Sequence, residues 1–113
     1  MKVLVCGGRK FNDMVSMDKV LNELLAEGMS RLIQGGAPGA DTLARTWAMF
    51  RKIDCVTYEA NWASFGRAAG PLRNQEMLDK EKPDLVVAFP GGRGTADMIK
   101  KAEKAGVPVR RIA

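Results

Sequence analysis

The chain of 113 residues contains no histidine and only two cysteines, Cys6 and Cys55. The absence of histidine excludes Ser-His and Cys-His catalysis and disfavours zinc sites of the usual kind, which depend on imidazole and thiolate ligands. Two cysteines make a poor disulfide framework, and both lie in strand-like runs, so we expect buried, reduced thiols. The sequence therefore predicts no metal site and no cofactor.

Long apolar segments are also absent. The longest run, Leu85 to Phe89, is far shorter than a membrane span, so no membrane association is expected. The chain starts directly with a strand-like run and shows no basic region followed by an apolar stretch and a cleavage site. We expect a cytoplasmic protein whose residues 1–113 form a single domain.

The formal net charge is +5, a balance that suits phosphorylated ligands and also nucleic acid. Three groups of basic residues bear on this choice, and one of them is Arg110-Arg111 near the carboxyl terminus. Four arginines lie in or beside predicted loops: Arg9, Arg67, Arg73 and Arg93. Three lysines lie on a predicted helix: Lys100, Lys101 and Lys104. We interpret these lysines as a solvated helix face and not as a DNA surface.

Strand-like and helical patterns alternate along the whole chain. Five apolar segments predict strands: Lys2–Cys6, Arg31–Gln34, Ile53–Tyr58, Leu85–Phe89 and Val107–Ile112. Amphipathic segments with three- and four-residue spacing predict a helix after each of the first four strands. Before the third of these helices, residues 59–70 are expected to form an irregular stretch. This alternation predicts the α/β class, as a single Rossmann-like, three-layer domain with a five-stranded parallel sheet. The strand order that we expect is 3-2-1-4-5.

Three glycine-rich turns follow predicted strands, at residues 6–9, 34–41 and 90–95. Glycine lets backbone N–H groups approach a ligand closely, and a turn that opens a helix binds anions. With the expected strand order, all three turns meet at the carboxyl edge of the sheet, where open α/β folds bind ligands. The turns match neither a Walker A loop nor G-x-G-x-x-G, which disfavours a conventional ATPase or NAD dehydrogenase. The predicted ligand-binding residues are Gly7, Gly8, Arg9, Gly35, Gly36, Ala37, Gly39, Ala40, Asp41, Arg73, Asn74, Pro90, Gly91, Gly92, Arg93, Gly94 and Thr95.

Four polar side chains near these turns have two interpretations each. Arg73 follows Pro71 at the start of a helix, where a cation opposes the helix dipole. Either an anionic ligand or a salt bridge to Asp41 or another acid would explain it. Asp41 either satisfies local N–H groups or acts as a ribose acceptor or acid–base group, and Asp97 has the same ambiguity. Thr95 either caps its helix or binds a phosphate oxygen.

Two aromatic residues, Trp62 and Phe65, lie in the irregular stretch. We expect them to cover the end of the core, which is the commoner use of loop aromatics. The alternative is that they stack on a base while the segment acts as a lid.

The motifs together resemble the SLOG superfamily, and most closely its small YspA-like branch. The resemblance covers nearly the whole chain and is carried by Gly7-Gly8-Arg9 with Phe11 and Asp13, Gly35-Gly36-Ala37 with Gly39-Ala40-Asp41, Trp47-Ala48, Ala69-Gly70-Pro71 with Arg73-Asn74 and Met77, and Phe89-Pro90-Gly91-Gly92 with Gly94-Thr95. It implies a Rossmann-like fold, a site for nucleotides or nucleotide-derived molecules, and a homodimer or higher homo-oligomer.

Within this superfamily, the Lonely Guy type phosphoribohydrolases cleave the N-glycosidic bond of nucleoside monophosphates. Their signature is P-G-G-x-G-T-x-x-E, preceded by an Arg at the start of a helix. Pro90 to Thr95 match the signature and Arg73 takes a position similar to that Arg, but Met98 stands where the catalytic Glu is expected. A thioether cannot handle a proton, so the resemblance implies binding more than hydrolysis.

Three functions follow from these observations. The first is a domain that binds a nucleotide-like phosphorylated ligand to sense, sequester or process it. The second is a nucleotide N-glycosidase with Arg73, Asp41 and Asp97 as its candidate catalytic residues. The third is a single-stranded DNA-binding module that resembles DNA-processing protein A, which the absence of an aromatic-rich basic stripe disfavours.

Overall fold

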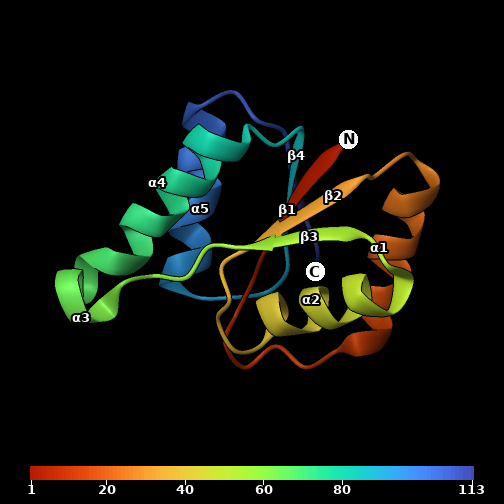
Figure 1. The fold of residues 1–113 in the computed structure, drawn as a ribbon, viewed down its shortest axis with the longest axis horizontal. Coiled ribbons are helices and arrows are strands. Elements are labelled where there is room, and N and C mark those ends of the chain that lie inside the picture. The colour runs from red at the N-terminus through yellow and green to blue at the C-terminus, as the bar shows by residue number, and fades with distance from the viewer.

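A five-stranded sheet forms the centre of the computed structural model, which describes all residues 1–113 (Figure 1). Every strand pairs in parallel with its neighbours, in the order β3-β2-β1-β4-β5. The strands are β1 (Lys2–Cys6), β2 (Arg31–Gln34), β3 (Asp54–Thr57), β4 (Leu85–Ala88) and β5 (Val109–Arg111). The predicted class, Rossmann-like sheet and strand order are confirmed.

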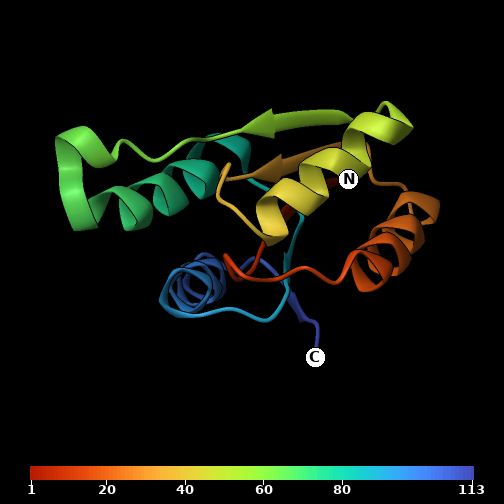
Figure 2. The same ribbon diagram turned by 90° about the horizontal axis from the view of Figure 1, so that it is seen from below.

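Helices cover both faces of the sheet. They are α1 (Met14–Ala26), α2 (Ala40–Arg51), α3 (Trp62–Phe65), the 3₁₀ turn η1 (Gly66–Ala68), α4 (Ala69–Glu81) and α5 (Arg93–Lys104). The first two lie over one face, and α4 and α5 lie over the other, as Figures 1 and 2 show from two directions. None of these helices combines the length and the apolar character needed to traverse a bilayer.

The central strand β1 divides the core in two, because alternate side chains point to opposite faces of a sheet. Val3 and Val5 pack with α1 and α2, whereas Leu4 and Cys6 pack with α4 and α5. All four of these side chains are buried, as expected of a strand covered on both faces. Trp47 is the largest fully buried side chain and fills the α1–α2 side.

The segment before α4 differs from what the sequence predicted. Residues 59–70 were expected to be irregular, but they contain α3 and η1, and α4 begins at Ala69, two residues before Pro71. Asn61 caps α3, since its side chain accepts a hydrogen bond from the Ser64 N–H at 3.1 Å. This segment carries the chain beyond the carboxyl ends of β2 and β3 (Figures 1 and 2).

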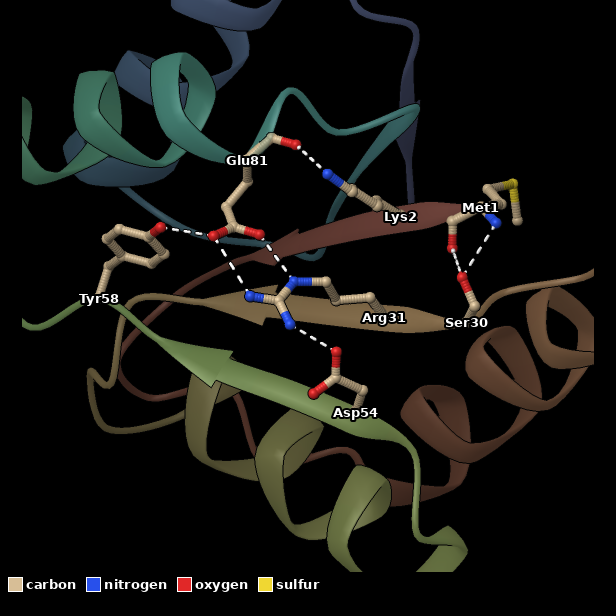
Figure 3. A network of polar contacts seen from close by, with 7 residues as sticks. All are labelled: Met1, Lys2, Ser30, Arg31, Asp54, Tyr58 and Glu81. Carbon is tan, nitrogen blue, oxygen red and sulfur yellow. Dashed lines mark hydrogen bonds and ion pairs between the residues drawn. The ribbon is translucent and has the colours of Figure 1, made fainter.

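Glu81, the last residue of α4, joins that helix to the sheet through the network in Figure 3. Its carboxylate accepts hydrogen bonds from Arg31 Nε at 2.8 Å and from the Tyr58 hydroxyl at 2.5 Å. Arg31 also pairs with Asp54 of the neighbouring strand. The hydrogen bond from Arg31 holds the pKa of Glu81 below its usual value, and the bond to Glu81 raises the pKa of Tyr58 to about 12.

Replacing Glu81 with Gln is therefore expected to lower the free energy of unfolding by about 2 kcal/mol at pH 7, because charge-assisted hydrogen bonds to a buried carboxylate are lost. A carboxyl with a lowered folded-state pKa stabilises the fold above its unfolded pKa, so the difference should shrink as the pH falls below about 4.5. Urea unfolding at several pH values measures this effect. Glu76→Gln on the same helix is the control, since Glu76 makes only an exposed pair with Lys80 at 3.6 Å.

Candidate functional site

The three glycine turns meet at the carboxyl edge of the sheet, with the first turn held between the other two. The Gly8 N–H donates to the Pro90 carbonyl at 2.8 Å, and the Gly8 carbonyl accepts from the Ala40 N–H at 3.1 Å. The backbone of residues 7–9 therefore bonds directly to the turn after β4 and to the start of α2. This geometry confirms the expected convergence of the turns.

Four of the glycines are required by the packing of one turn on another. A Cβ at Gly7 would lie 2.5 Å from that of Ala40, and one at Gly8 would lie 2.8 Å from the Pro90 carbonyl oxygen. Cβ atoms at Gly39 and Gly91 would collide with the carbonyl of Gly8 and the hydroxyl of Thr95. The packing of one turn on another therefore explains why glycine stands at these four positions. The sequence alone had suggested that they are glycine because a ligand approaches them.

Gly92 and Gly94 differ, because a Cβ at either would meet nothing within 4 Å and neither has a positive φ. Gly92 is the N-cap of α5, makes no side-chain cap, and is followed by a first turn without an acidic residue. The first N–H groups of a helix have no partner within the helix. The fold therefore leaves an uncapped helix N-terminus with open space in front of it.

A cleft of ≈ 870 Å³ lies against these turns. Five basic residues line it and only two acidic ones, Asp41 and Asp97. The basic residues are Arg9, Lys10, Arg67, Arg73 and Arg93. The predicted binding residues that line it are Gly7, Gly8, Arg9, Ala37, Asp41, Arg73, Asn74, Pro90, Gly91, Gly92, Arg93, Gly94 and Thr95. The excess of positive charge and the helix N-terminus together favour an anionic ligand.

A smaller hollow of ≈ 180 Å³ adjoins the cleft. It contains the predicted residues Gly35 and Gly36 and shares Arg9, Ala37 and Arg73 with the cleft. Gly39 and Ala40 line neither hollow, and Ala40 is fully buried. Their prediction as ligand contacts is not supported by their position, since both pack against the first turn at Gly8.

Arg73 crosses from α4 to the turn after β2. Its guanidinium donates to the Gly35 carbonyl at 2.6 Å and, through Nε, to the Asn74 side chain at 3.1 Å. It forms no ion pair with Asp41, so the salt-bridge interpretation is wrong. Burial lowers the pKa of Arg73, against the attraction of Asp41. The side chain is therefore held by neutral acceptors, and its charge remains available to the cleft.

Asp41 lies in the first turn of α2 and is only 7% exposed. One carboxylate oxygen accepts the Ala37 N–H at 3.2 Å, which confirms that it satisfies a local backbone group. Burial nevertheless raises its pKa to about 6, because the hydrogen bonds and the charge of Arg73 only partly offset desolvation. Asp41 thus lines the cleft as a carboxyl whose pKa is raised by burial.

Asn74 and Asp97 link α4 to α5 beside the cleft. The Asn74 amide donates to the Asp97 carboxylate at 3.0 Å and to the Gly94 carbonyl at 3.3 Å. Asp97 also pairs with Lys101 at 2.6 Å. Burial raises the pKa of Asp97, but the hydrogen bonds from Lys101 and Asn74 outweigh it, and the pKa is lowered. Both residues are therefore occupied by protein partners and position the start of α5.

The structure settles one interpretation of Thr95 and shows where Met98 lies. Thr95 does not cap α5, because the helix begins at Arg93 and Gly92 is the N-cap. Met98 is fully buried in the core between the sheet and α4 and α5. The position expected to carry a catalytic Glu therefore does not reach the cleft at all.

The aromatic residues of α3 are the clearest site feature that sequence reasoning misplaced. Trp62 and Phe65 were expected to cover the end of the core, but they are 52% and 55% exposed, and Trp62 lines both hollows. Arg67 and Phe11 line the cleft as well. Asn61 and Ser64 carry the spacing of a helix cap, a signal that would have placed Trp62 on a short helix and not in an irregular loop.

Comparison with known proteins identifies the family. The sequence model of the YspA, cpYpsA-related SLOG family matches residues 1–65, more than half of the chain. The chain belongs to this family. The Gene 61 protein of Mycobacterium phage D29 is 35% identical over 117 residues, which cover 96% of this chain and 93% of that protein. The SLOG assignment agrees with the resemblance that the glycine turns carry.

Two solved structures share the fold. The structural genomics target TM1055 aligns with a TM-score of 0.71 at 21% identity, over 96% of this chain and 71% of that one. DNA processing protein A (DprA) from Streptococcus pneumoniae aligns with a TM-score of 0.56 at 19% identity, over 96% of this chain and 57% of that one. At these identities, the similarity to the two solved structures shows a shared fold and nothing more.

Proposed function

We propose that this chain binds a nucleotide or nucleotide-derived phosphorylated ligand at the carboxyl edge of its sheet. One observation carries the proposal: the N-terminus of α5 is uncapped, and Gly92 and Gly94 keep the space before it open although neither protein packing nor φ requires glycine there. A phosphate group bound by these N–H groups would explain the two glycines, because side chains there would occupy the space that the phosphate needs. The family and the excess of cations around the cleft support the same function.

The phosphate end of the ligand lies at α5 in this proposal. Arg9, Arg73 and Arg93 line the cleft and neutralise the phosphate charge. Asp41, with its pKa of about 6, accepts a hydrogen bond from a hydroxyl of the ligand. Asn74 positions the site by holding both Arg73 and the start of α5.

Gly94→Asp tests this proposal directly. The added carboxylate stands in open space in the first turn of α5, where it stabilises the helix by about 0.3–1 kcal/mol but repels a bound phosphate. Calorimetric titration with adenosine, guanosine, cytidine and uridine 5′-monophosphates should show saturable binding to the wild type. We expect the variant to bind the same nucleotide at least about tenfold more weakly.

Val15→Asp is the matched control, because Val15 occupies the equivalent second position of α1, is 81% exposed and does not line the cleft. This control should be stabilised in the same way and should bind like the wild type. Equal affinity of Gly94→Asp and the control, or no saturable binding of any nucleotide by the wild type, contradicts the proposal.

A hydrolytic role is the second candidate, because Asp41, Asp97 and Arg73 all line one cleft. The burial of Met98 and the pairing of Asp97 with Lys101 weigh against it. Chromatography of the titrated nucleotides tests it. Release of free base by the wild type that is lost in Asp41→Asn supports catalysis, whereas intact nucleotides support binding alone.

A further inference from the structure

Trp62 is the largest apolar side chain at the cleft, yet it is 52% exposed, whereas Trp47 is fully buried. Leaving so large an apolar surface in water is unfavourable. We infer that Trp62 stacks on the base of a nucleotide bound in the cleft, and so distinguishes nucleotides from other phosphate esters. This inference rests on the proposed function and deepens it.

The placement of Trp62 supports this role. It begins α3, which extends beyond the carboxyl ends of β2 and β3 (Figures 1 and 2). A Cβ at Gly70 of α4 would approach Cη2 of the indole to 3.3 Å, so the tip of the ring lies against this glycine. One end of the ring therefore has a fixed neighbour, while about half of the side chain stays accessible.

Trp62 also stands at the boundary between the two hollows. It lines both, together with Arg9 and Arg73, which are the charges expected to face the phosphate. A ligand whose phosphate is bound at α5 and which extends into the smaller hollow therefore passes beside the indole. Stacking between an aromatic side chain and a base is favourable for every base, because each presents a π-face.

The smaller hollow shares Arg9 and Arg73 with the cleft and differs from it by one carboxylate, which favours the uncharged end of the ligand there. Glu59 lines this hollow and does not line the cleft. A carboxylate repels phosphate, but it accepts hydrogen bonds from hydroxyl and amino groups. The uncharged base or ribose end therefore belongs beside Trp62 and Glu59, and the phosphate belongs at the opposite end, at the first turn of α5.

Phe65 supplies the matched control. It lies on the same short helix, is 55% exposed and lines neither hollow. A loss of binding caused by general damage to α3 should therefore appear in Phe65→Ala as well as in Trp62→Ala. A loss of stacking should appear only at Trp62.

The experiment compares adenosine 5′-monophosphate with ribose 5-phosphate by calorimetry. We expect the wild type to bind the nucleotide at least about tenfold more tightly than the sugar phosphate. Trp62→Ala should remove this preference by weakening the nucleotide alone, Trp62→Phe should keep part of it, and Phe65→Ala should keep all of it. The nucleotide should also quench part of the tryptophan emission of the wild type, but not that of Trp62→Phe, in which only the buried Trp47 remains.

The outcomes separate the two proposals. Equal binding of both compounds by the wild type, or a Trp62→Ala variant that keeps the preference, overturns the stacking role and leaves the phosphate site intact. A Trp62→Ala variant that loses both compounds equally also overturns it, since the residue then acts only on the shape of the site. If the wild type binds neither ribose 5-phosphate nor any of the four nucleoside monophosphates, the proposed function fails and the stacking role fails with it.

Discussion

Gly39→Ala is expected to destabilise the protein by about 3 kcal/mol, because it forces apart two of the turns that build the cleft. Gly39 has φ +85° and ψ −126°, a combination that side chains rarely adopt and that costs about 1–3 kcal/mol. Its Cβ would also lie 2.6 Å from the Arg9 carbonyl carbon and collide with the Gly8 carbonyl. The hydrogen bond from Ala40 N–H to the Gly8 carbonyl cannot survive this displacement.

Urea unfolding measures the loss, and Gly94→Ala is the control. The same change at Gly94 enters open space within the first turn of a helix, so it should stabilise the protein by about 0.5–1 kcal/mol. Opposite signs for the two variants are the expected result. A Gly39→Ala variant within about 0.5 kcal/mol of the wild type would show that the two turns are not held together by this contact.

Asp41→Asn is expected to stabilise the protein by up to about 3 kcal/mol at pH 7.5, and by little at pH 4. The folded-state pKa of about 6 lies above the ordinary value of 3.8, so the folded protein binds this proton more tightly than the unfolded chain. Stability from this group is present below about pH 4 and is lost as the pH rises to about 6. Asn removes the buried charge and keeps an oxygen for the Ala37 N–H.

The measurement is the difference in unfolding free energy between wild type and Asp41→Asn at pH 4, 5, 6 and 7.5. Asp79→Asn is the control for the change in net charge, because Asp79 lies on an exposed part of α4. A difference that does not grow between pH 4 and pH 6, or a destabilised variant at pH 7.5, would show that the Asp41 carboxylate is compensated in the folded state. A confirmed gain would mean that the protein keeps this carboxylate for its ligand and not for its fold.

The arrangement of the sheet could be predicted because each of its causes is local. Buried strands such as Leu85–Ala88 can be recognised as continuous hydrophobic runs. Gly28 and Gly106, both with positive φ, mark the ends of α1 and α5. The alternation of these elements with helices then permits few topologies. The meeting of the three turns at one edge follows from the strand order.

The roles of single residues at that edge could not be predicted, because they depend on distances between segments far apart in the sequence. Gly8 and Gly92 both follow strands in glycine pairs, yet one is enclosed by the neighbouring turn and the other faces open space. The same limit explains why a salt bridge from Arg73 to an acid was considered, when its guanidinium holds the Gly35 carbonyl 38 residues away. The exposure of Trp62 could not be predicted, because a four-residue helix has no apolar periodicity that shows which side chains face the core.

The interlocking of the turns through Gly8, Pro90 and Ala40 divides the binding edge into a fixed base and a changeable border. Backbone contacts build the base, so it tolerates little substitution, whereas the exposed Arg67 and Arg93 at the border make no contact that the fold requires. Mutation can therefore alter the border while the base stays intact. A few surface substitutions can therefore change the shape and charge of the cleft without altering the fold.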